Sequence, residues 1–550
     1  MTTIGNHFST LKTAQSDKAR GEQKQNNAGG FVFTLDCWAR LDRFLILGSE
    51  GGTYYVSEKK LTIDNAKGVI ECLKADATRT IDRIVEISTA GRAPKNDAAI
   101  FALAIAAGAD EPRTRQMALA ALPKVCRIGT HLFRFVDDVE NFRKWGRGLR
   151  NAVGRWYNEK TADQVAFQAI KYAQREGWSH RDVLRKAHPT PYSDEHGAIY
   201  RYVTGGFDSF EKVMKHGGAV DKAKLPRIVD GFERLKVAEN EKDVISLVRD
   251  YKLPHECVDG KWKGSKEVWE ALLPDMGQTA LIRNLGKMTS VGLFGPMGAM
   301  TKLAVKMLTD KEAIKRGRVH PMAILIAQGV YAQGHGDKGN LSWSPVREIV
   351  DALDEAFYVA FDAIVPTGKN HFLGLDISGS MSSAFIANTR LSACQASAAM
   401  AMVTARTEQN YFMAGFTASG RSSWGGGGSE MTPMSFAKNA RLDTVMSLMH
   451  QLSARMGRTD CALPMIYAAE KKIEVDTFVI YTDSETWAGT IHPFQALTEY
   501  RQKMGRPAKL VVVGMTSTEF TIADPSDAGS LDVVGFDAAA PAVIADFARD

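Results

Sequence analysis

Cysteine is scarce in this chain and is not spaced for a metal site or a disulfide framework. The six cysteines among the 550 residues are Cys37, Cys72, Cys126, Cys257, Cys394 and Cys461, and no two of them form a C-x-x-C pair. Zinc sites and disulfide-stapled folds need cysteines at short, repeated spacings. We therefore expect reduced thiols that lie in the core.

Long hydrophobic runs are also missing. No apolar stretch reaches the ~18 residues that a membrane-spanning helix needs, and the nearest one, residues 391–405, is short and rich in small side chains. The first 30 residues carry charged and amide side chains without an apolar segment, so no secretory signal is visible. The sequence therefore predicts a cytoplasmic protein with no membrane partner.

Two families of enzyme motif are absent as well. No GxxxxGK[ST] sequence, which would cradle a triphosphate, occurs, and none of the 12 histidines lies in an HExxH motif. The first absence disfavours an NTPase, and the second means that the histidines show no metal-ligand spacing. We expect His131 and His335 to be helix-end or core histidines.

The composition that remains is that of a globular protein with an uneven charge. The chain is 45% hydrophobic and 24% charged, and its length predicts about two to four domains. Residues 371–550 hold 14 Lys and Arg against 18 Asp and Glu, whereas residues 1–370 hold 55 against 45. This imbalance indicates a polyanion partner for the first part only.

The pattern of apolar residues divides the chain into three parts. Residues 1–28 are polar and predict a flexible arm. Residues 29–365 read as stacked helical hairpins, with helices over 96–107, 114–122 and 163–176 and a capping box at residues 179–182. From residue 366 to 550, apolar strands over 371–376, 410–416, 476–482 and 509–515 alternate with helices, which predicts an α/β domain with a parallel sheet.

A candidate metal site lies at the end of the first of these strands. Asp376, Ser378 and Ser380 form a D-x-S-x-S sequence, Thr459 lies in a loop before a helix, and Asp483 follows another strand. Ligand sites form at the carboxyl ends of parallel strands, and hard oxygen ligands suit Mg²⁺. Glu485 is near enough in sequence to approach through water. The alternative is that Asp376 and its serines only cap a turn.

Cations gather in two places along the helical part. Lys171 and Arg175 are four residues apart, so we expect them to share one face at the C-terminal end of their helix, and His188 ends the next helix. These side chains fit the phosphates of an RNA stem, although the helix dipole alone also favours cations at a C-terminus. In residues 141–157, five cations alternate with Trp145, Trp156 and Tyr157. This pattern fits either single-strand RNA binding or arginines that surround buried aromatic rings.

The chain resembles the Ro autoantigen family, in which a TROVE module precedes a von Willebrand factor A-type domain. The matching stretches are residues 43–55, 125–133, 145–157, 177–184 and 281–289 in the helical part, and 457–465, 482–487 and 520–525 in the last third. The resemblance implies a HEAT-like helical repeat ring (TROVE, 29–365) followed by an α/β, Rossmann-like von Willebrand A domain (366–550).

The resemblance also implies a function. Ro proteins bind small Y RNAs on the outer surface of the ring and take single-stranded 3′ ends of misfolded or structured noncoding RNA into the central hole. In bacteria a Y RNA tethers some relatives to the 3′ exoribonuclease polynucleotide phosphorylase. The family's Y RNA contacts fall on Lys171, Arg175 and His188, and its metal ligands fall on Asp376, Ser378, Ser380, Thr459 and Asp483.

Three departures from the family pattern stand out, of which one is the Pro-Thr-Pro sequence at residues 189–191, after His188. Gly129 replaces a proline that many relatives carry, and a glycine-rich insert occupies residues 422–430 of the metal domain.

We therefore expect a monomeric, non-enzymatic RNA-binding scaffold of a ribonucleoprotein that serves RNA quality control or processing and carries a divalent metal ion, Mg²⁺. One alternative is an adapter that binds an acidic side chain of a partner protein through the metal. A metal-dependent nuclease is the other alternative, and it is disfavoured because only Asp376 and Asp483 converge.

Overall fold

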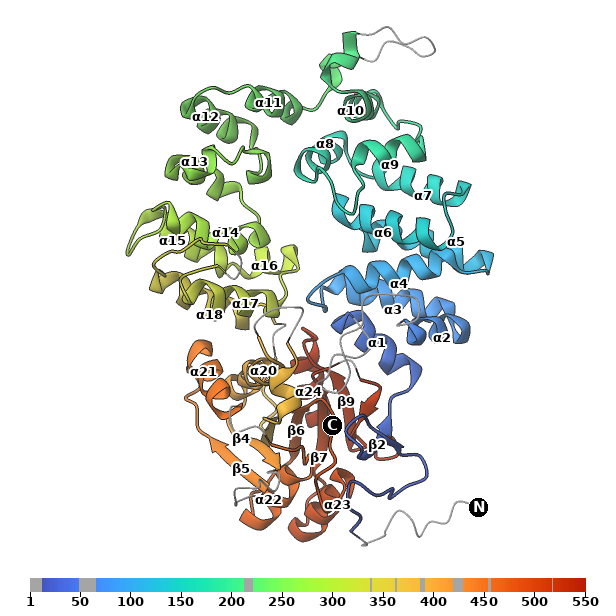
Figure 1. The fold of residues 1–550 in the computed structure, drawn as a ribbon, viewed down its shortest axis with the longest axis vertical. Coiled ribbons are helices and arrows are strands. Elements are labelled where there is room, and N and C mark those ends of the chain that lie inside the picture. The colour runs from blue at the N-terminus through green and yellow to red at the C-terminus, as the bar shows by residue number, and fades with distance from the viewer. Residues whose placement is uncertain are drawn as a thin grey trace. The chain divides into compact units, whose positions relative to one another are not determined.

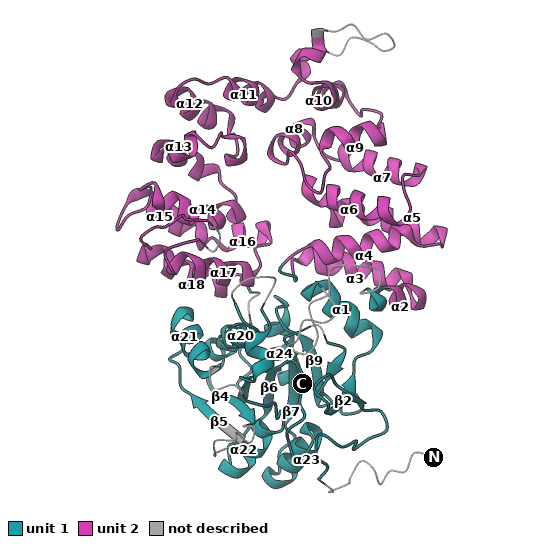
Figure 2. Cartoon of the chain, viewed as in Figure 1, with its two compact units in different colours: residues 1–69, 92–94, 361–550 teal, residues 70–91, 95–360 magenta. Residues whose placement is uncertain are grey.

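The chain forms two compact units (Figure 2). The computed structural model describes residues 12–48, 66–211, 221–336, 339–361, 364–385, 391–418, 429–453, 457–516 and 518–550. Unit 1 joins residues 1–69 and 92–94 to residues 361–550, and unit 2 contains residues 70–91 and 95–360. The α/β part thus includes the N-terminal segment, whereas the expected boundary at residue 366 had assigned residues 29–69 to the helices.

Unit 2 is helical (Figure 1). Its helices are α2 (Lys67–Ala75, which begins in unit 1), α3 (Ala77–Ala90), α4 (Asp97–Gly108), α5 (Pro112–Val125), α6 (Gly129–Phe142), α7 (Arg147–Asn158), α8 (Ala162–Lys171), α9 (His180–Ala187), α10 (Asp194–Gly205), α11 (Arg227–Lys236), α12 (Glu241–Tyr251), α13 (Lys266–Leu272), α14 (Gln278–Ser290), α15 (Ala299–Leu308), α16 (Lys311–Gly317), α17 (Pro321–Ala332) and α18 (Arg347–Val359). Each helix packs mainly on near neighbours in sequence, as stacked hairpins do.

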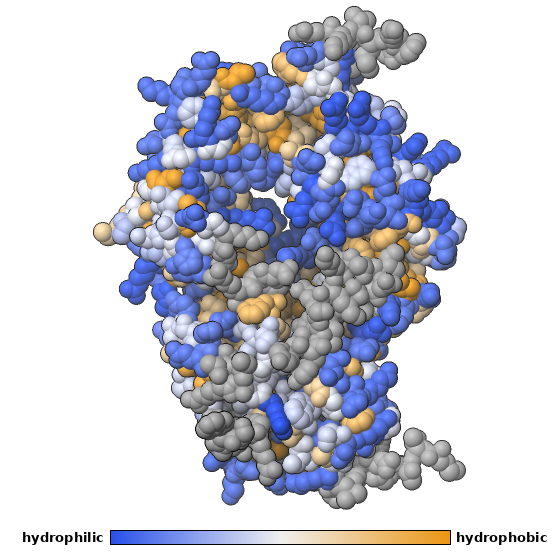
Figure 3. All heavy atoms as spheres, in the orientation of Figure 1, coloured by the Kyte–Doolittle hydropathy of each residue, from blue (hydrophilic) through white to orange (hydrophobic). Residues whose placement is uncertain are grey.

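The helical series curves back on itself, so that a segment near its end contacts a helix near its start. Arg318, just after α16, donates from Nε to the carbonyl oxygen of Thr89 in α3 over 2.7 Å. A Cβ on Gly91 would lie 3.0 Å from the Cβ of Arg318, so the glycine permits this approach. Figure 3 shows that the unit is hollowed between its earlier and its later helices, and the residues around the hollow are mostly hydrophilic. The predicted ring of helical repeats is therefore confirmed.

Unit 1 contains a six-stranded sheet of order β5-β4-β3-β6-β7-β9 (Figure 1). Its strands are β3 (His371–Asp376), β4 (Tyr411–Ala418), β5 (Ser429–Met434), β6 (Thr477–Thr482), β7 (Lys509–Gly514) and β9 (Ser530–Val534). All neighbours pair in parallel except β5, which runs antiparallel to β4. The four predicted strands are confirmed, and the two edge strands are additional.

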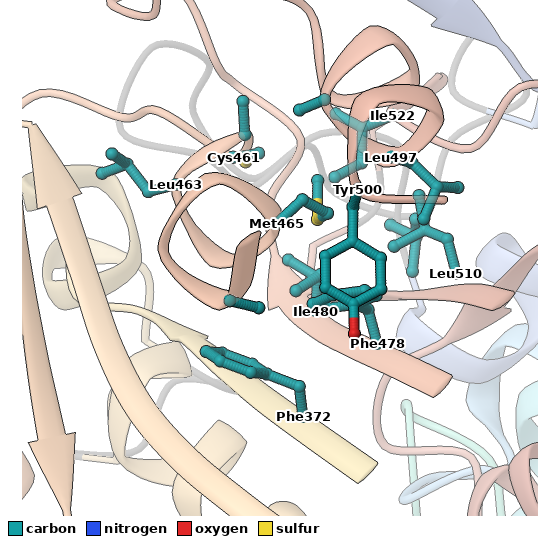
Figure 4. Close-up of a cluster of buried hydrophobic side chains, with 14 of the residues drawn as sticks. Phe372, Cys461, Leu463, Met465, Phe478, Ile480, Leu497, Tyr500, Leu510 and Ile522 are labelled. Carbon is teal, nitrogen blue, oxygen red and sulfur yellow. The ribbon is translucent and has the colours of Figure 1, made fainter. Parts of the chain in front are cut away.

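Helices complete unit 1. They are α1 (Cys37–Leu47), α19 (Gly379–Ser383), α20 (Ala393–Thr407), α21 (Leu442–Ser453), α22 (Leu463–Lys471), α23 (Pro493–Met504) and α24 (Ala540–Arg549). Between the sheet and α22 and α23 lies a core in which Phe478 meets Tyr500 edge-to-face, with ring centroids 4.9 Å apart (Figure 4). This buried core contains Phe372 of β3 and Phe478 and Ile480 of β6.

From residue 12 onward the N-terminal segment packs on the rest of unit 1. The sequence predicted instead that residues 1–28 form a flexible arm. Residues 1–11 lie outside the described residues, but β1 (Lys24–Gln25) and β2 (Phe31–Thr34) form a small antiparallel sheet with β8 (Phe520–Thr521). Arg43, 2% exposed, pairs with Asp532 over 2.9 Å and anchors α1 beside β9. Pairing of β2 with β8, some 490 residues later in the chain, orders the N-terminal segment, and its local composition gives no sign of this pairing.

One predicted helix ends early. Helix α8 ends at Lys171, whereas the sequence predicts a helix as far as Glu176. Glu176 and Gly177 both have positive φ, of 50° and 77°, and form a tight turn closed by two backbone hydrogen bonds between Arg175 and Trp178. Two successive residues with φ > 0 are typical of a two-residue hairpin turn and are incompatible with a helix.

In the part of the chain that the structure describes, no helix combines the length and the apolar character needed to cross a bilayer.

Candidate functional site

Two buried carboxylates lie between β3 and β6, where the order in which the chain adds strands to the sheet reverses. The chain leaves β3 for β4 on one side, and β6 pairs with β3 on the other side, so the ends of β3 and β6 meet at a topological switch point. Asp376 is the last residue of β3 and is 0% exposed, and Asp483 directly follows β6 and is 1% exposed. The strands thus bring the two predicted aspartates to one place.

Hydroxyl groups surround these carboxylates. Asp376 accepts hydrogen bonds from the Ser378 backbone N–H, over 2.9 Å, and from the Thr482 hydroxyl, over 2.7 Å. The Oγ atoms of Ser378 and Ser380 are 3.1 Å apart. Both serines are buried, so their hydroxyl groups lie out of water together with the Asp376 carboxylate.

Thr459 approaches on a separate loop. The Gly379 N–H donates to the Gly457 carbonyl over 3.4 Å, which brings this loop beside the serines. The Thr459 carbonyl accepts hydrogen bonds from the N–H groups of Trp487 and Ala488, both over 3.1 Å. All five predicted metal ligands are therefore buried at the carboxyl edge of the sheet.

The electrostatics of the site are unfavourable without a cation. Burial, reinforced by the charge of Asp483, raises the pKa of Asp376 to about 7. Burial also raises the pKa of Asp483, whose Oδ2 has no hydrogen-bond partner among the residues that the structure describes. Two carboxylates, one of which carries the orphaned oxygen, and three hydroxyls form an all-oxygen set that fits Mg²⁺.

Glu485 does not join this set. Its Oε1 accepts a hydrogen bond from the Asn27 amide over 2.6 Å, and its Oε2 accepts one from the Ala28 N–H over 3.1 Å. The carboxylate therefore faces the N-terminal segment, not the metal ligands. Sequence reasoning missed these partners because it treated residues 1–28 as mobile. The amide-rich stretch at residues 23–27 was the available signal.

The predicted RNA-contact residues lie in unit 2, on the consecutive segments α8, hairpin 172–178 and α9. Lys171 ends α8 and is 19% exposed, with its Nζ 3.8 Å from Glu256. Arg175 belongs to the hairpin and is 58% exposed, with its Nε 3.2 Å from Glu176. The expectation that both lie on one helical face is wrong because α8 ends between them.

His188 follows α9, at the end of a helix that begins with the predicted capping box. Ser179 and Asp182 form both reciprocal bonds of that box. His188 ends the helix in the left-handed conformation, with φ 47°, and is exposed. Arg185 and Lys186, in the last turn, add exposed cations beside it.

The aromatic residues near the second group of cations are core residues. Trp156 and Tyr157 are both 0% exposed, and the Tyr157 hydroxyl lies 2.8 Å from Nδ1 of buried His180. Arg147, Arg150 and Arg155 are exposed around them. Trp156 and Tyr157 are therefore buried rings surrounded by arginines, and the interpretation of residues 141–157 as a single-strand RNA site does not apply to these two side chains.

The structure also shows the surroundings of the remaining residues that the sequence analysis named. His131 is half-buried in the first turn of α6, which fits the expected helix-end histidine, and burial lowers its pKa to about 3. His335 is exposed. Gly129 begins α6, where its N–H donates to Gln168 and an added Cβ would lie 2.6 Å from Nε2 of His180. Most of the glycine-rich insert, residues 422–428, lies outside the described residues.

Both units match known domain families. Residues 24–330 match the model of the TROVE domain, and residues 370–548 match the model of the Ro60 vWA domain. A helical TROVE domain followed by a von Willebrand A-type domain defines the class of protein.

Relatives agree with this class over nearly the whole chain. The RNA-binding protein RO60 of Deinococcus radiodurans is 41% identical over 542 residues, 98% of either chain. The RNA-binding protein RO60 of Caenorhabditis elegans is 36% identical over 601 residues, 97% of this chain and 91% of the other. The crystal structure of the Deinococcus radiodurans RO (RSR) protein has a TM-score of 0.68 at 40% identity and covers 94% of this chain and 99% of that one. The chain belongs to the Ro (RO60) family.

The carboxylate pair predicts an unusual pH dependence for the metal-free protein. Because the folded-state pKa of Asp376 is raised, the folded state binds more protons than the unfolded state between about pH 4 and pH 7. Stability should therefore fall as the pH rises through this range. Asp483→Asn should raise the free energy of unfolding at pH 7.5 by ~1 kcal/mol, because it removes one of the two like charges.

Urea denaturation in EDTA at pH 5 and pH 7.5 measures this effect. Asp546→Asn, at a position that is 75% exposed, is the matched control and should change little. A loss of stability in Asp483→Asn that is equal at both pH values would contradict charge repulsion.

Proposed function

We propose that this protein is a non-enzymatic RNA-binding scaffold of a Ro ribonucleoprotein. The observation that carries the proposal is the group of exposed cationic side chains on the hairpin after α8 and at the end of α9, in a domain whose relatives are named RNA-binding proteins. The proposed ligand is a Y-like small RNA, whose stem phosphates Lys171, Arg175 and His188 contact. Phosphate contacts of this kind position an RNA without reading its sequence.

A second RNA site is proposed in the hollow of unit 2. A single-stranded 3′ end of a misfolded or structured noncoding RNA would enter there, while the stem stays outside. The hydrophilic residues around the hollow support this assignment (Figure 3). A 3′ exoribonuclease such as polynucleotide phosphorylase is the proposed partner that would act on the presented end.

The two sites predict separable defects. Arg175→Ala should weaken binding of a blunt RNA hairpin about fivefold, ~1 kcal/mol, and lower the slope of log K against log salt by about 1, because one phosphate contact is lost. His188→Ala should weaken binding similarly. Binding of a single-stranded 3′ tail should persist in both variants. Fluorescence anisotropy at several salt concentrations measures both quantities.

Arg347→Ala serves as the control for this experiment, because it removes a cation that is 86% exposed on α18. It should leave hairpin binding unchanged. Equal loss of hairpin and tail binding in Arg175→Ala would contradict the two-site model.

The acidic neighbour of Lys171 predicts a variant that gains affinity. Glu256 lies 3.8 Å from Lys171 and also accepts from Nδ1 of His255 over 2.9 Å, so it competes with phosphate for the lysine. Glu256→Gln should strengthen hairpin binding about threefold, which is within the range of a partly exposed ion pair. Glu86→Gln, on α3, removes the same charge from a different pair and is the control. Weaker binding in Glu256→Gln would exclude Lys171 as a phosphate contact.

We further propose that the carboxylate site of unit 1 binds Mg²⁺. Asp376, Ser378, Ser380, Thr459 and Asp483 would hold the ion, which would supply an open coordination position for a carboxylate of a partner protein. The orphaned Asp483 Oδ2 supports this proposal. The adapter function is thereby retained as a second candidate, attached to a different unit from the RNA sites.

Mg²⁺ should stabilise the wild-type protein against heat at pH 7.5 and less so at pH 5, where protons compete for Asp376. Asp483→Asn should abolish the Mg²⁺-dependent shift in Tm and keep RNA binding. Differential scanning calorimetry with Mg²⁺ and with EDTA measures this shift. An unchanged wild-type Tm at saturating Mg²⁺ would contradict the metal assignment.

A further inference from the structure

The N-terminal strap, residues 12–34, lies against both loops that carry candidate metal ligands outside the first strand. We propose that the strap is part of the metal site, with Gln15 and Asn26 as residues that position the ligand loops, and that strap docking and Mg²⁺ binding favour each other. This inference rests on the proposed metal site.

The first loop is held through Gln15, which is 0% exposed. Its Nε2 donates to Oδ1 of Asp460, the neighbour of Thr459, over 2.7 Å and to the Ile491 carbonyl over 2.9 Å. Its Oε1 accepts a hydrogen bond from the Thr486 hydroxyl. One buried amide thus joins the Thr459 loop to the segment that follows Asp483.

The second loop is held by Asn26, Asn27 and Ala28. The amide of Asn26, 5% exposed, donates to the carbonyls of Ser484, over 3.2 Å, and Thr486, over 2.9 Å. Asn27 and Ala28 together occupy both carboxylate oxygens of Glu485. Gly30 lies so close that an added Cβ would overlap the Thr486 carbonyl. Every residue from Ser484 to Thr486 therefore contacts the strap.

These contacts have a consequence for metal binding. Without the strap, Glu485 would return to water, and the backbone of both loops would have to be ordered when the ion binds. Ordering at the moment of binding costs free energy and lowers affinity. By reciprocity, an ion that binds better to the ordered loops must stabilise the docked strap by the same factor.

The test is Mg²⁺ titration of the full-length protein by isothermal calorimetry. Gln15→Ala and Asn26→Ala should each raise the Kd for Mg²⁺ about five- to tenfold, as expected for lost buried hydrogen bonds. Asn27→Ala, a milder change at an exposed position, should raise it about twofold. Unchanged Mg²⁺ affinity in variants whose circular dichroism is native would overturn the proposal.

A matched control separates positioning from general destabilisation. Arg506 pairs with Asp476 over 2.8 Å beside the start of β6, at the end of the strand opposite Asp483. Arg506→Ala should lower the metal-free Tm and keep the Kd for Mg²⁺. An increase in Kd equal to that of Gln15→Ala would show that metal affinity follows stability alone and would overturn the proposal.

Trypsin cleavage at Lys18 and Lys24, both exposed in the strap, gives the reciprocal readout. Mg²⁺ should slow cleavage in the wild type and not in Asp483→Asn. Cleavage that is independent of Mg²⁺ in a wild type that binds the ion would overturn the coupling and leave the metal site intact. A wild type that binds no Mg²⁺ would overturn both.

Discussion

Two carboxylates held side by side out of water set the chemistry of the α/β unit. Asp376 and Asp483 are brought together by parallel pairing of β3 and β6, and the same core that buries their strands removes the solvent that would screen their charges. Burial, reinforced by the charge of Asp483, raises the pKa of Asp376. The surrounding hydroxyls, the Thr459 loop and the N-terminal strap all contact this pair or its loops. A hard divalent cation bound there would neutralise the two negative charges.

The helical unit handles charge in the opposite way. Its candidate RNA contacts are cations that are partly exposed, and two of them already lie beside carboxylates, Lys171 with Glu256 and Arg175 with Glu176. Such pairs contribute little to stability, so under the proposed function a phosphate would replace the carboxylate at small cost. The helical series carries these side chains, and Arg318 joins a late segment of the series to α3 near its start.

The sequence predicted more of the sheet than of its surroundings. The strand over residues 371–376 and the ligands on it were predictable because apolar runs and a D-x-S-x-S sequence are local signals. The strap was not, since its order comes from pairing with β8 and from amide side chains that reach the loops near residues 460 and 485. The predicted helix over residues 163–176 was too long, because residues 172–176 have ordinary helix propensity. Only the backbone conformation of Glu176 and Gly177 shows the turn.

We propose that one RNA uses two surfaces of the helical unit, with its stem outside the helical series and its free 3′ end within it. The most direct measurement is the affinity of the wild-type protein for one RNA hairpin with a single-stranded 3′ tail, without the tail, and with the tail circularised, at low and moderate salt. Our account predicts that the free tail binds most tightly, that circularisation removes its advantage, and that all affinities fall with salt. Equal binding of the free and circularised tails, or affinities independent of salt, would contradict it.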